Sequence, residues 1–184
     1  GLGSVSFKDD PDSYDRGFLH CDLLIIGAGP AGLAAALVAA KSGAEVILAD
    51  EDFNMGGRLN SERFSLNHQS GVDWAQSTVL ELQSFQNVRL MPRTTILGAF
   101  DHGIYGALER VSDHLLVPLA GKPRQILWQI YTKRSLLCAG ATERPIAFEN
   151  NDRPGIMLAG AMRSYANRWA VTPSQSVAIF TNND

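Results

Sequence analysis

Short apolar runs alternate with a helical pattern along the first part of the chain. Residues 22–26 are apolar on both alternating faces, which is typical of a parallel strand covered by helices on both sides. An alanine-rich stretch follows from Pro30 and ends at Ser42-Gly43, the proline-first and glycine-last pattern of a helix. Residues 45–50 predict a second strand. Residues 22–51 therefore predict one right-handed βαβ unit.

The apolar pattern changes in the middle of the chain. A polar stretch after Asp52 precedes a predicted helix over residues 74–85 and a short strand over residues 88–90, which continue the doubly wound topology. Further strands are expected, separated by turn residues, at 95–100, 105–111, 125–132 and 135–139. The simplest interpretation is an antiparallel β-meander inserted in a parallel sheet.

The last part of the pattern predicts a helix over residues 159–169 and an apolar strand over residues 176–180. Because a parallel strand needs a helix to cover it, we expect the sequence to be part of a longer protein. The predicted division of the chain is a polar linker at residues 1–20, a first dinucleotide-binding domain with the meander at 21–142, and the start of a second dinucleotide-binding half at 143–184.

Composition narrows the functional classes. The formal charge is only −3 and the basic residues are scattered, so a nucleic-acid partner is not expected. Glycines and a proline interrupt the longest apolar run, at residues 23–40, so we expect no membrane span. Two cysteines, Cys21 and Cys138, fit a reducing compartment better than a disulfide scaffold, and the cytoplasm is the expected location.

The sequence Gly27-Ala-Gly29-Pro-Ala-Gly32 places a G-x-G-x-x-G motif between the first strand and its helix. Gly27 would form the tight turn, Gly29 would let a pyrophosphate approach the backbone, and Gly32 would let helix and strand pack closely. The amides near Ala31 and Gly32 would face the phosphates, with the positive end of the helix dipole behind them.

Asp50 lies 23 residues after Gly27, at the predicted end of the second strand. A carboxylate there can accept the hydroxyls of an adenosine ribose, and Glu51 could share or take this role. It would also repel a 2′-phosphate, so NAD or FAD is expected rather than NADP. An acidic residue at a strand end can alternatively be only the start of a solvated loop.

Gly56-Gly57-Arg58 has two possible interpretations. It either brings the chain close to the cofactor or forms a flexible turn with a surface arginine.

Outside the glycine loop and the acidic segment, the sequence offers little evidence for metal ligands or catalytic side chains. The four histidines are far apart and form no pattern of metal ligands, and those at residues 102 and 114 fall at predicted turns, so we expect no metal site. The serines and cysteines lack the surroundings of a nucleophile elbow. The sequence therefore indicates no catalytic residue and no substrate.

Several segments together resemble the α subunit of heterotetrameric sarcosine oxidase, a flavoenzyme family related to opine and proline dehydrogenase α subunits. The segments that carry the resemblance are residues 21–33, 48–53, 56–59, 143–145, 151–159 and 180–184. The resemblance implies an α/β fold, namely a Rossmann-like FAD/NAD(P)-binding domain of the two-dinucleotide-domain flavoprotein type. It also implies an oxidoreductase that converts sarcosine to glycine, with hydrogen peroxide and formaldehyde or methylene-tetrahydrofolate as the other products.

The resemblance further implies that this part binds NAD, with FAD as the alternative, and that β, γ and δ subunits are its partners. FAD and FMN would belong mainly to the β subunit. The family's NAD contacts would fall on Ala31, Asp50, Glu51, Asp52, Arg58 and Leu97. The segment Leu136–Gly140 resembles the Ala-Thr-Gly signature of these flavoproteins, although Cys138 and Ala139 replace its first two residues. The expected dinucleotide site consists of Gly27, Gly29, Pro30, Ala31, Gly32, Asp50, Glu51, Asp52, Gly57, Arg58, Leu97 and Gly140.

Two other functions stay open at this point. One is a self-sufficient FAD reductase, in which FAD would occupy the glycine loop; the absence of a Cys-x-x-Cys pair argues against its thiol–disulfide variety. The other is a structural scaffold in which the dinucleotide has no redox role, because the same loop and carboxylate serve binding in either case.

Overall fold

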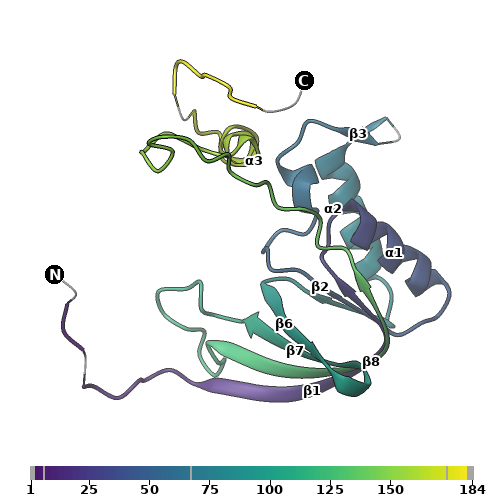
Figure 1. The fold of residues 1–184 in the computed structure, drawn as a ribbon. Helices are drawn as coiled ribbons and strands as arrows, with labels where there is room; N and C mark the ends of the chain where they lie inside the picture. The colour runs from purple at the N-terminus through teal and green to yellow at the C-terminus, as the bar shows by residue number, and fades with distance from the viewer. Residues whose placement is uncertain (1–2, 6, 67, 173, 182–184) are drawn as a thin grey trace.

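A computed structural model describes residues 3–5, 7–66, 68–172 and 174–181 (Figure 1). Its helices are α1 (Pro30–Lys41), α2 (Gly71–Gln83) and α3 (Ala159–Arg163), with short helical turns η1 (Gly57–Asn60), η2 (Asp101–Gly103) and η3 (Ser164–Arg168). Its strands are β1 (Tyr14–Ile26), β2 (Val46–Ala49), β3 (Ser65–Leu66), β4 (Gln69–Ser70), β5 (Val88–Met91), β6 (Thr94–Phe100), β7 (Ile104–Arg110) and β8 (Gln125–Leu137).

Six strands form one mixed sheet in the order β5-β2-β1-β8-β7-β6. Strands β5, β2, β1 and β8 run parallel to one another, whereas β6, β7 and β8 pair in antiparallel fashion. The parallel part carries the βαβ unit, and the antiparallel part is the meander that the sequence predicted. Together they confirm the α/β fold of the Rossmann-like FAD/NAD(P)-binding type.

The sheet bends because β1 and β8 contribute to both of its parts. The backbone amides of Asp22 and Leu23 both donate to the carbonyl of Glu45, at the point where the pairing of β1 with β2 begins. Before this point β1 pairs with the meander half of β8, and after it β1 lies between β2 and the end of β8. The bend turns the meander back over one face of the parallel strands, as Figure 1 shows.

Two hydrophobic cores result from this arrangement. The first lies between the parallel strands and helices α1 and α2, and includes the fully buried Ile25, Leu33 and Leu48. The second lies between the parallel strands and the meander, and includes Leu24 and Ile130. Each face of the central strands is thus buried, which is why β2 is apolar at every position.

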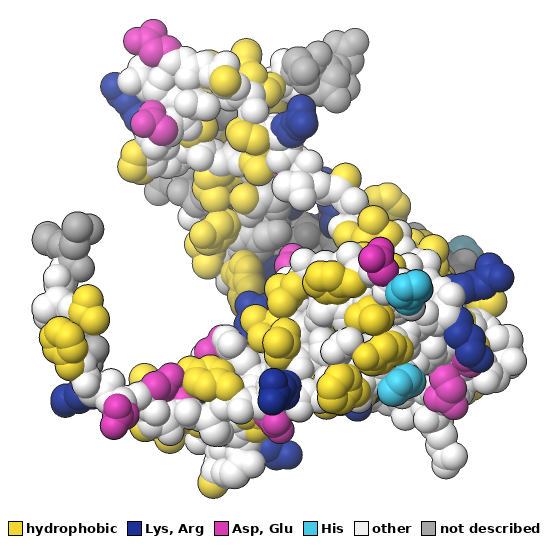
Figure 2. Space-filling model, turned by 60° about the horizontal axis from the view of Figure 1, so that its bottom comes forward, with side chains coloured by type: hydrophobic (Ala, Val, Ile, Leu, Met, Phe, Trp, Pro, Cys, Tyr) yellow, Lys and Arg dark blue, Asp and Glu magenta, His cyan; other side chains and the backbone are white. Residues whose placement is uncertain are grey.

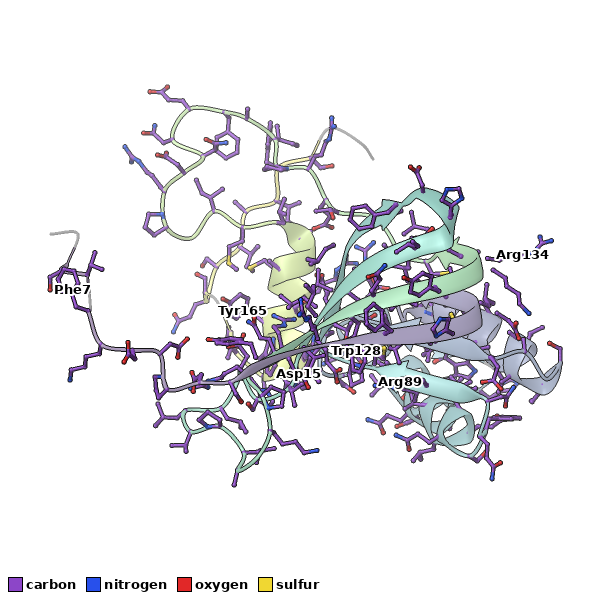
Figure 3. The ribbon with its side chains drawn as sticks, turned by 90° about the horizontal axis from the view of Figure 1, so that it is seen from below. Phe7, Asp15, Arg89, Trp128, Arg134 and Tyr165 are labelled. Carbon is purple, nitrogen blue, oxygen red and sulfur yellow. The ribbon has the colours of Figure 1, made fainter. Side chains whose placement is uncertain are left out.

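The side chain of Trp128 is partly buried and packs against the second core. Its indole nitrogen donates to a carboxylate oxygen of Glu109 at 2.6 Å, so the buried N–H has a partner. The guanidinium carbon of Arg89, on β5, lies 4.9 Å from the centre of the indole ring (Figure 3). This contact joins the parallel edge of the sheet to the meander.

The outer face of the meander carries exposed apolar side chains. Phe18, Phe100 and Leu127 are each at least half exposed. Figure 2 shows hydrophobic side chains gathered on this face. In the described part of the chain, no helix is long and apolar enough to cross a membrane.

The structure corrects four sequence predictions. Residues 14–20, interpreted as part of a linker, form the first half of β1, because their backbone pairs with β8 although their side chains are mostly exposed. The two strands predicted at 125–132 and 135–139 are the single strand β8, and the predicted helix at 159–169 is divided between α3 and η3. The strand predicted at 176–180 is absent, since no described strand lies beside it to accept its hydrogen bonds.

Candidate functional site

The glycine loop between β1 and α1 is tightly packed at its first and third glycines. A Cβ on Gly27 would lie 2.5 Å from the carbonyl oxygen of Cys138, and Gly27 has a φ of +101°. A Cβ on Gly32 would overlap the carbonyl oxygen of Gly27. Only glycine fits at either position, because the loop, the helix and the end of β8 are in backbone contact.

Gly29 differs from its two neighbours because it faces open space. No heavy atom lies within 4 Å of the position that a Cβ would occupy. Gly29 is also the N-cap of α1, and the first helical turn contains no acidic residue. The amides of Ala31 and Gly32 precede the first intrahelical donor, Leu33, so they are available to an anion. Loop and helix thus form a cradle that fits a pyrophosphate.

The Gly56-Gly57 pair packs directly on this loop. The amide of Gly56 donates to the carbonyl of Ala28 at 2.8 Å. A Cβ on Gly57 would lie 2.8 Å from the Cα of Gly29, and Gly57 has a φ of +55°. Because residue 57 is glycine, its backbone can pack directly against Gly29. This packing favours the interpretation in which the Gly56-Gly57 pair lies near the cofactor over the one in which it is a flexible turn.

The end of β8 passes beside the same loop. The amide of Cys138 donates to the carbonyl of Ile26 at 2.7 Å, which fixes the chain next to Gly27. Gly140 follows two residues later with a φ of +69° and has open space around it. The substitution of the Ala-Thr-Gly signature at Cys138 and Ala139 has therefore not moved the backbone away from the glycine loop.

Asp50 braces the glycine loop. Its carboxylate accepts the amide of Ala28 at 2.5 Å and the amide of Asp52 at 2.8 Å. Each oxygen thus has a backbone partner, one on the loop before α1 and one on the loop after β2. The structure gives Asp50 a role in holding these loops together, in addition to or in place of the ribose contact expected from the sequence.

Glu51 has the free carboxylate of this acidic segment. Among the described residues it makes no ion pair, and it is exposed. It lines a shallow depression of about 390 Å³ together with Asp52, Phe53, Arg93 and Arg110. The depression lies at the carboxyl end of β2, where an adenosine ribose is expected in this fold.

The carboxylate of Asp52 binds a side chain that lies 116 residues later in the sequence. Its two carboxylate oxygens accept hydrogen bonds from Arg168 at 2.6 and 2.7 Å. Burial raises the pKa of Asp52, but the hydrogen bonds from Arg168 and from the amide of Asn54 outweigh it, so the pKa falls below its ordinary value. Asp52 therefore acts as the anchor of Arg168.

Aromatic rings support this anchor. The guanidinium of Arg168 lies 4.9 Å from the ring centre of Phe53 and 4.8 Å from that of Trp169. Arg93 lies 5.0 Å from the same Phe53 ring. Cation–π contacts of this kind stabilise partly buried arginines. The segment at η3 is thereby fixed to the loop that carries Glu51.

Arg58 takes part in a second group of ion pairs. Its guanidinium lies 3.3 Å from Glu62 and 3.7 Å from Glu143, and Arg163 lies 3.5 and 3.6 Å from the same two carboxylates. Glu143 also accepts the amide of Gly160 at 2.7 Å. The side chain of Arg58 is half exposed and is held by carboxylates of its own chain.

Leu97 lies on β6, at a shift in register, and its side chain is 58% exposed. No contact joins it to the glycine loop or to the acidic segment, so the structure does not bring it together with the other predicted residues. Sequence reasoning also missed three arginines near the site, Arg93, Arg110 and Arg168. They belong to no motif, and the chain brings them to the end of β2 only when it is folded.

Both cysteines are free, and burial raises the pKa of each thiol. Within the described ranges, no three or more histidine, cysteine, aspartate or glutamate side chains gather where a metal ion could bind. The chemistry of the site is therefore that of backbone amides, glycines, carboxylates and neighbouring arginines.

Comparison with known proteins agrees with this geometry. Residues 22–87 match the family model described as FAD dependent oxidoreductase. Over all 184 residues the chain is 49% identical to the α subunit of sarcosine oxidase from Rhizobium meliloti (strain 1021), and it spans 19% of that protein. It is 34% identical to an opine oxidase subunit from Agrobacterium tumefaciens (strain Ach5), covering 86% of the chain and 31% of the relative.

A solved structure resembles the fold. The crystal structure of L-proline dehydrogenase from P. horikoshii superimposes with a TM-score of 0.70 and 26% sequence identity, over 91% of this chain and 32% of that one. The resemblance that the sequence motifs indicated is thus confirmed over the whole chain. The chain spans about a fifth of the length of the Rhizobium meliloti α subunit.

Proposed function

From its similarity along its whole length to the α subunits of sarcosine oxidase, we propose that this chain is the dinucleotide-binding part of an oxidoreductase subunit. The dinucleotide is NAD, and its pyrophosphate lies over Gly29 at the start of α1. One observation carries the proposal: Gly29 is open to an approaching ligand while Gly27, Gly32 and Gly57 are closed by backbone around it. This pattern of one open glycine among packed ones is what a pyrophosphate site requires.

Each part of the site has a separate task. Gly29 and the amides of Ala31 and Gly32 receive the phosphates, because the N-terminal amides of α1 have no intrahelical acceptors. Asp50 holds the glycine loop in place through Ala28. Glu51 accepts the ribose hydroxyls, since its carboxylate is exposed and makes no ion pair among the described residues, whereas Asp52 is paired with Arg168.

The reaction that we propose for the whole enzyme is the one that the family resemblance implies. The complete assembly oxidises sarcosine to glycine, with flavin on partner subunits and oxygen as the electron acceptor. A dinucleotide at this site supplies either hydride transfer or structural support. The residues of this chain bind and orient it, and no side chain here is assigned to the oxidation of the amine. Partner subunits of the β, γ and δ types complete the enzyme, and the two free thiols support a cytoplasmic location.

FAD is the second candidate for the same site. The matched family model is described as an FAD dependent oxidoreductase, and the matched residues include the glycine loop and the acidic segment. The ADP half of FAD and of NAD is the same, so the loop geometry accepts both. In this case the protein would be a flavoprotein in its own right.

To identify the bound dinucleotide, the complete parent protein is expressed with its partners and the subunits are separated. Each subunit is then denatured, and the released molecules are identified by mass spectrometry. NAD recovered with this subunit, together with flavin recovered from a partner, supports the proposal. FAD recovered with this subunit would replace NAD as the cofactor.

The matched control is Gly29→Val, expressed in the same way. The branched side chain occupies the space expected for the pyrophosphate, and its Cβ has no heavy atom within 4 Å, so the protein should fold and lose its dinucleotide. If the variant keeps a full complement of dinucleotide, the site lies elsewhere.

A further inference from the structure

Two arginines share the depression at the end of β2 with Glu51. Arg93 stands in the turn between β5 and β6, and Arg110 ends β7. Backbone hydrogen bonds join them to the acidic segment: the amide of Arg93 donates to the carbonyl of Asp52 at 2.9 Å, and the amide of Arg110 donates to the carbonyl of Arg93 at 3.0 Å. Both arginines are therefore fixed in position relative to Glu51.

Their guanidinium groups are ordered but not neutralised. Nη2 of Arg110 donates to the backbone carbonyl of Glu51 at 2.6 Å, and Arg93 lies over the ring of Phe53. Within the part of the chain that the structure describes, neither forms an ion pair. Asp52, the other carboxylate of the depression, is paired with Arg168. Among the side chains that line the depression, the charges without an ion pair are thus those of Arg93, Arg110 and Glu51.

We infer that Arg93 and Arg110 form a phosphate-binding pair beside the expected adenosine ribose, and that the Glu51 carboxylate masks this pair. The inference rests on the proposed function, because it requires the adenosine ribose to lie at Glu51. The ligand class concerned is a nicotinamide dinucleotide with or without a phosphate on its adenosine ribose.

The physical argument is one of charge and geometry. A phosphate monoester carries close to two negative charges at neutral pH, and a carboxylate at the ribose repels it. Guanidinium groups bind phosphate oxygens through paired hydrogen bonds, and a group already held in place loses little entropy when it does so. When Glu51 loses its charge, the depression offers two ordered cations, and the one carboxylate left in its lining, Asp52, is paired with Arg168.

The test compares NAD and NADP, which differ only by the 2′-phosphate, on the complete protein freed of bound dinucleotide. Calorimetric titration of the wild type should show NAD binding at least about tenfold more tightly than NADP. Glu51→Gln should strengthen NADP binding by about tenfold or more and weaken NAD binding modestly. Glu45→Gln, which removes the same charge at the opposite end of β2, should leave both affinities unchanged.

The double variant Glu51→Gln with Arg110→Met should lose the gained NADP affinity, and the gain should fall steeply between 50 and 500 mM salt, as expected for a phosphate bound by charge. If Glu51→Gln binds NAD but gains no affinity for NADP, or if the gain survives Arg110→Met and Arg93→Met together, the inference is wrong. If the wild type binds neither dinucleotide, the proposed function itself fails.

Discussion

Gly29 and Gly32 belong to one motif, but the structure gives them different constraints. Gly29 is at a φ of −70°, which any residue adopts, and it faces open space, whereas a Cβ on Gly32 overlaps the Gly27 carbonyl oxygen. The fold does not require glycine at residue 29, so under the proposed function the requirement comes from the ligand. The requirement at residue 32 comes from the fold.

This difference predicts two outcomes for the same substitution. Gly29→Ala should leave the free energy of unfolding without ligand nearly unchanged, whereas Gly32→Ala should lower it by about 1–3 kcal/mol or more, since backbone must move. Thermal and denaturant unfolding of the dinucleotide-free proteins would measure both. Equal losses of stability would mean that the packing of this loop is not as described.

Asp50 and Glu51 are neighbours with separate tasks. Asp50→Asn retains one carbonyl oxygen where two backbone amides need acceptors, so it should lower the free energy of unfolding by about 1.5–3 kcal/mol. Glu51→Gln should leave stability within about 0.5 kcal/mol, because its side chain is exposed. Denaturant melts of both variants without ligand check this, and a stable Asp50→Asn protein would argue against its bracing role.

At the scale of elements, Arg168 connects η3 to the loop after β2. Both partners are mostly buried, and the contact is bidentate and stacked on two rings. The segment around Phe53 is therefore ordered by an element more than a hundred residues away.

The pH dependence of this contact has a definite sign. Because the pKa of Asp52 is lowered in the folded protein, its contribution to stability is present above the ordinary aspartate value near 4 and is lost as pH falls through the folded value. Arg168→Gln should therefore destabilise the protein at pH 7 by about 1–3 kcal/mol, and the difference from wild type should shrink below about pH 4. Denaturant unfolding across pH 2–8 tests this, and a difference independent of pH would show that stacking, rather than the ion pair, dominates.

At the scale of the whole molecule, the segment of residues 141–169 is attached mainly through charges. Glu143, Arg163 and Arg168 pair with residues 52–62, and Asn167 donates to the carbonyl of Ser61 at 2.8 Å. None of the residues of α3 or η3 is buried. The two hydrophobic cores, in contrast, contain no part of this segment.

Salt should therefore loosen this segment before it affects the cores. In the complete protein, limited proteolysis within residues 141–158 should become several times faster in 1 M NaCl than in 50 mM, because exposed ion pairs are screened. Glu143→Gln should show the faster rate already at low salt. Cleavage of an unfolded peptide under both conditions controls for the protease, and an unchanged rate would mean that apolar contacts hold the segment.

The sequence alone determined the βαβ unit, the meander and the glycine motif, because each is encoded by local patterns: doubly apolar strands, a proline-first helix and glycines at fixed spacing. It also placed the acidic segment at the end of β2. Tertiary structure decided what local pattern cannot carry. The polar residues 14–20 become a strand only because β8 offers them a partner, and residues 176–180 stay irregular since none is offered to them. Similarly, Asp50, Glu51 and Asp52 look alike in sequence. Only the folded chain shows that Asp50 binds the amide of Ala28, that Asp52 pairs with Arg168, and that the exposed Glu51 lines the depression. The physical reason is that hydrogen bonds and ion pairs between distant segments exist only once the chain has closed.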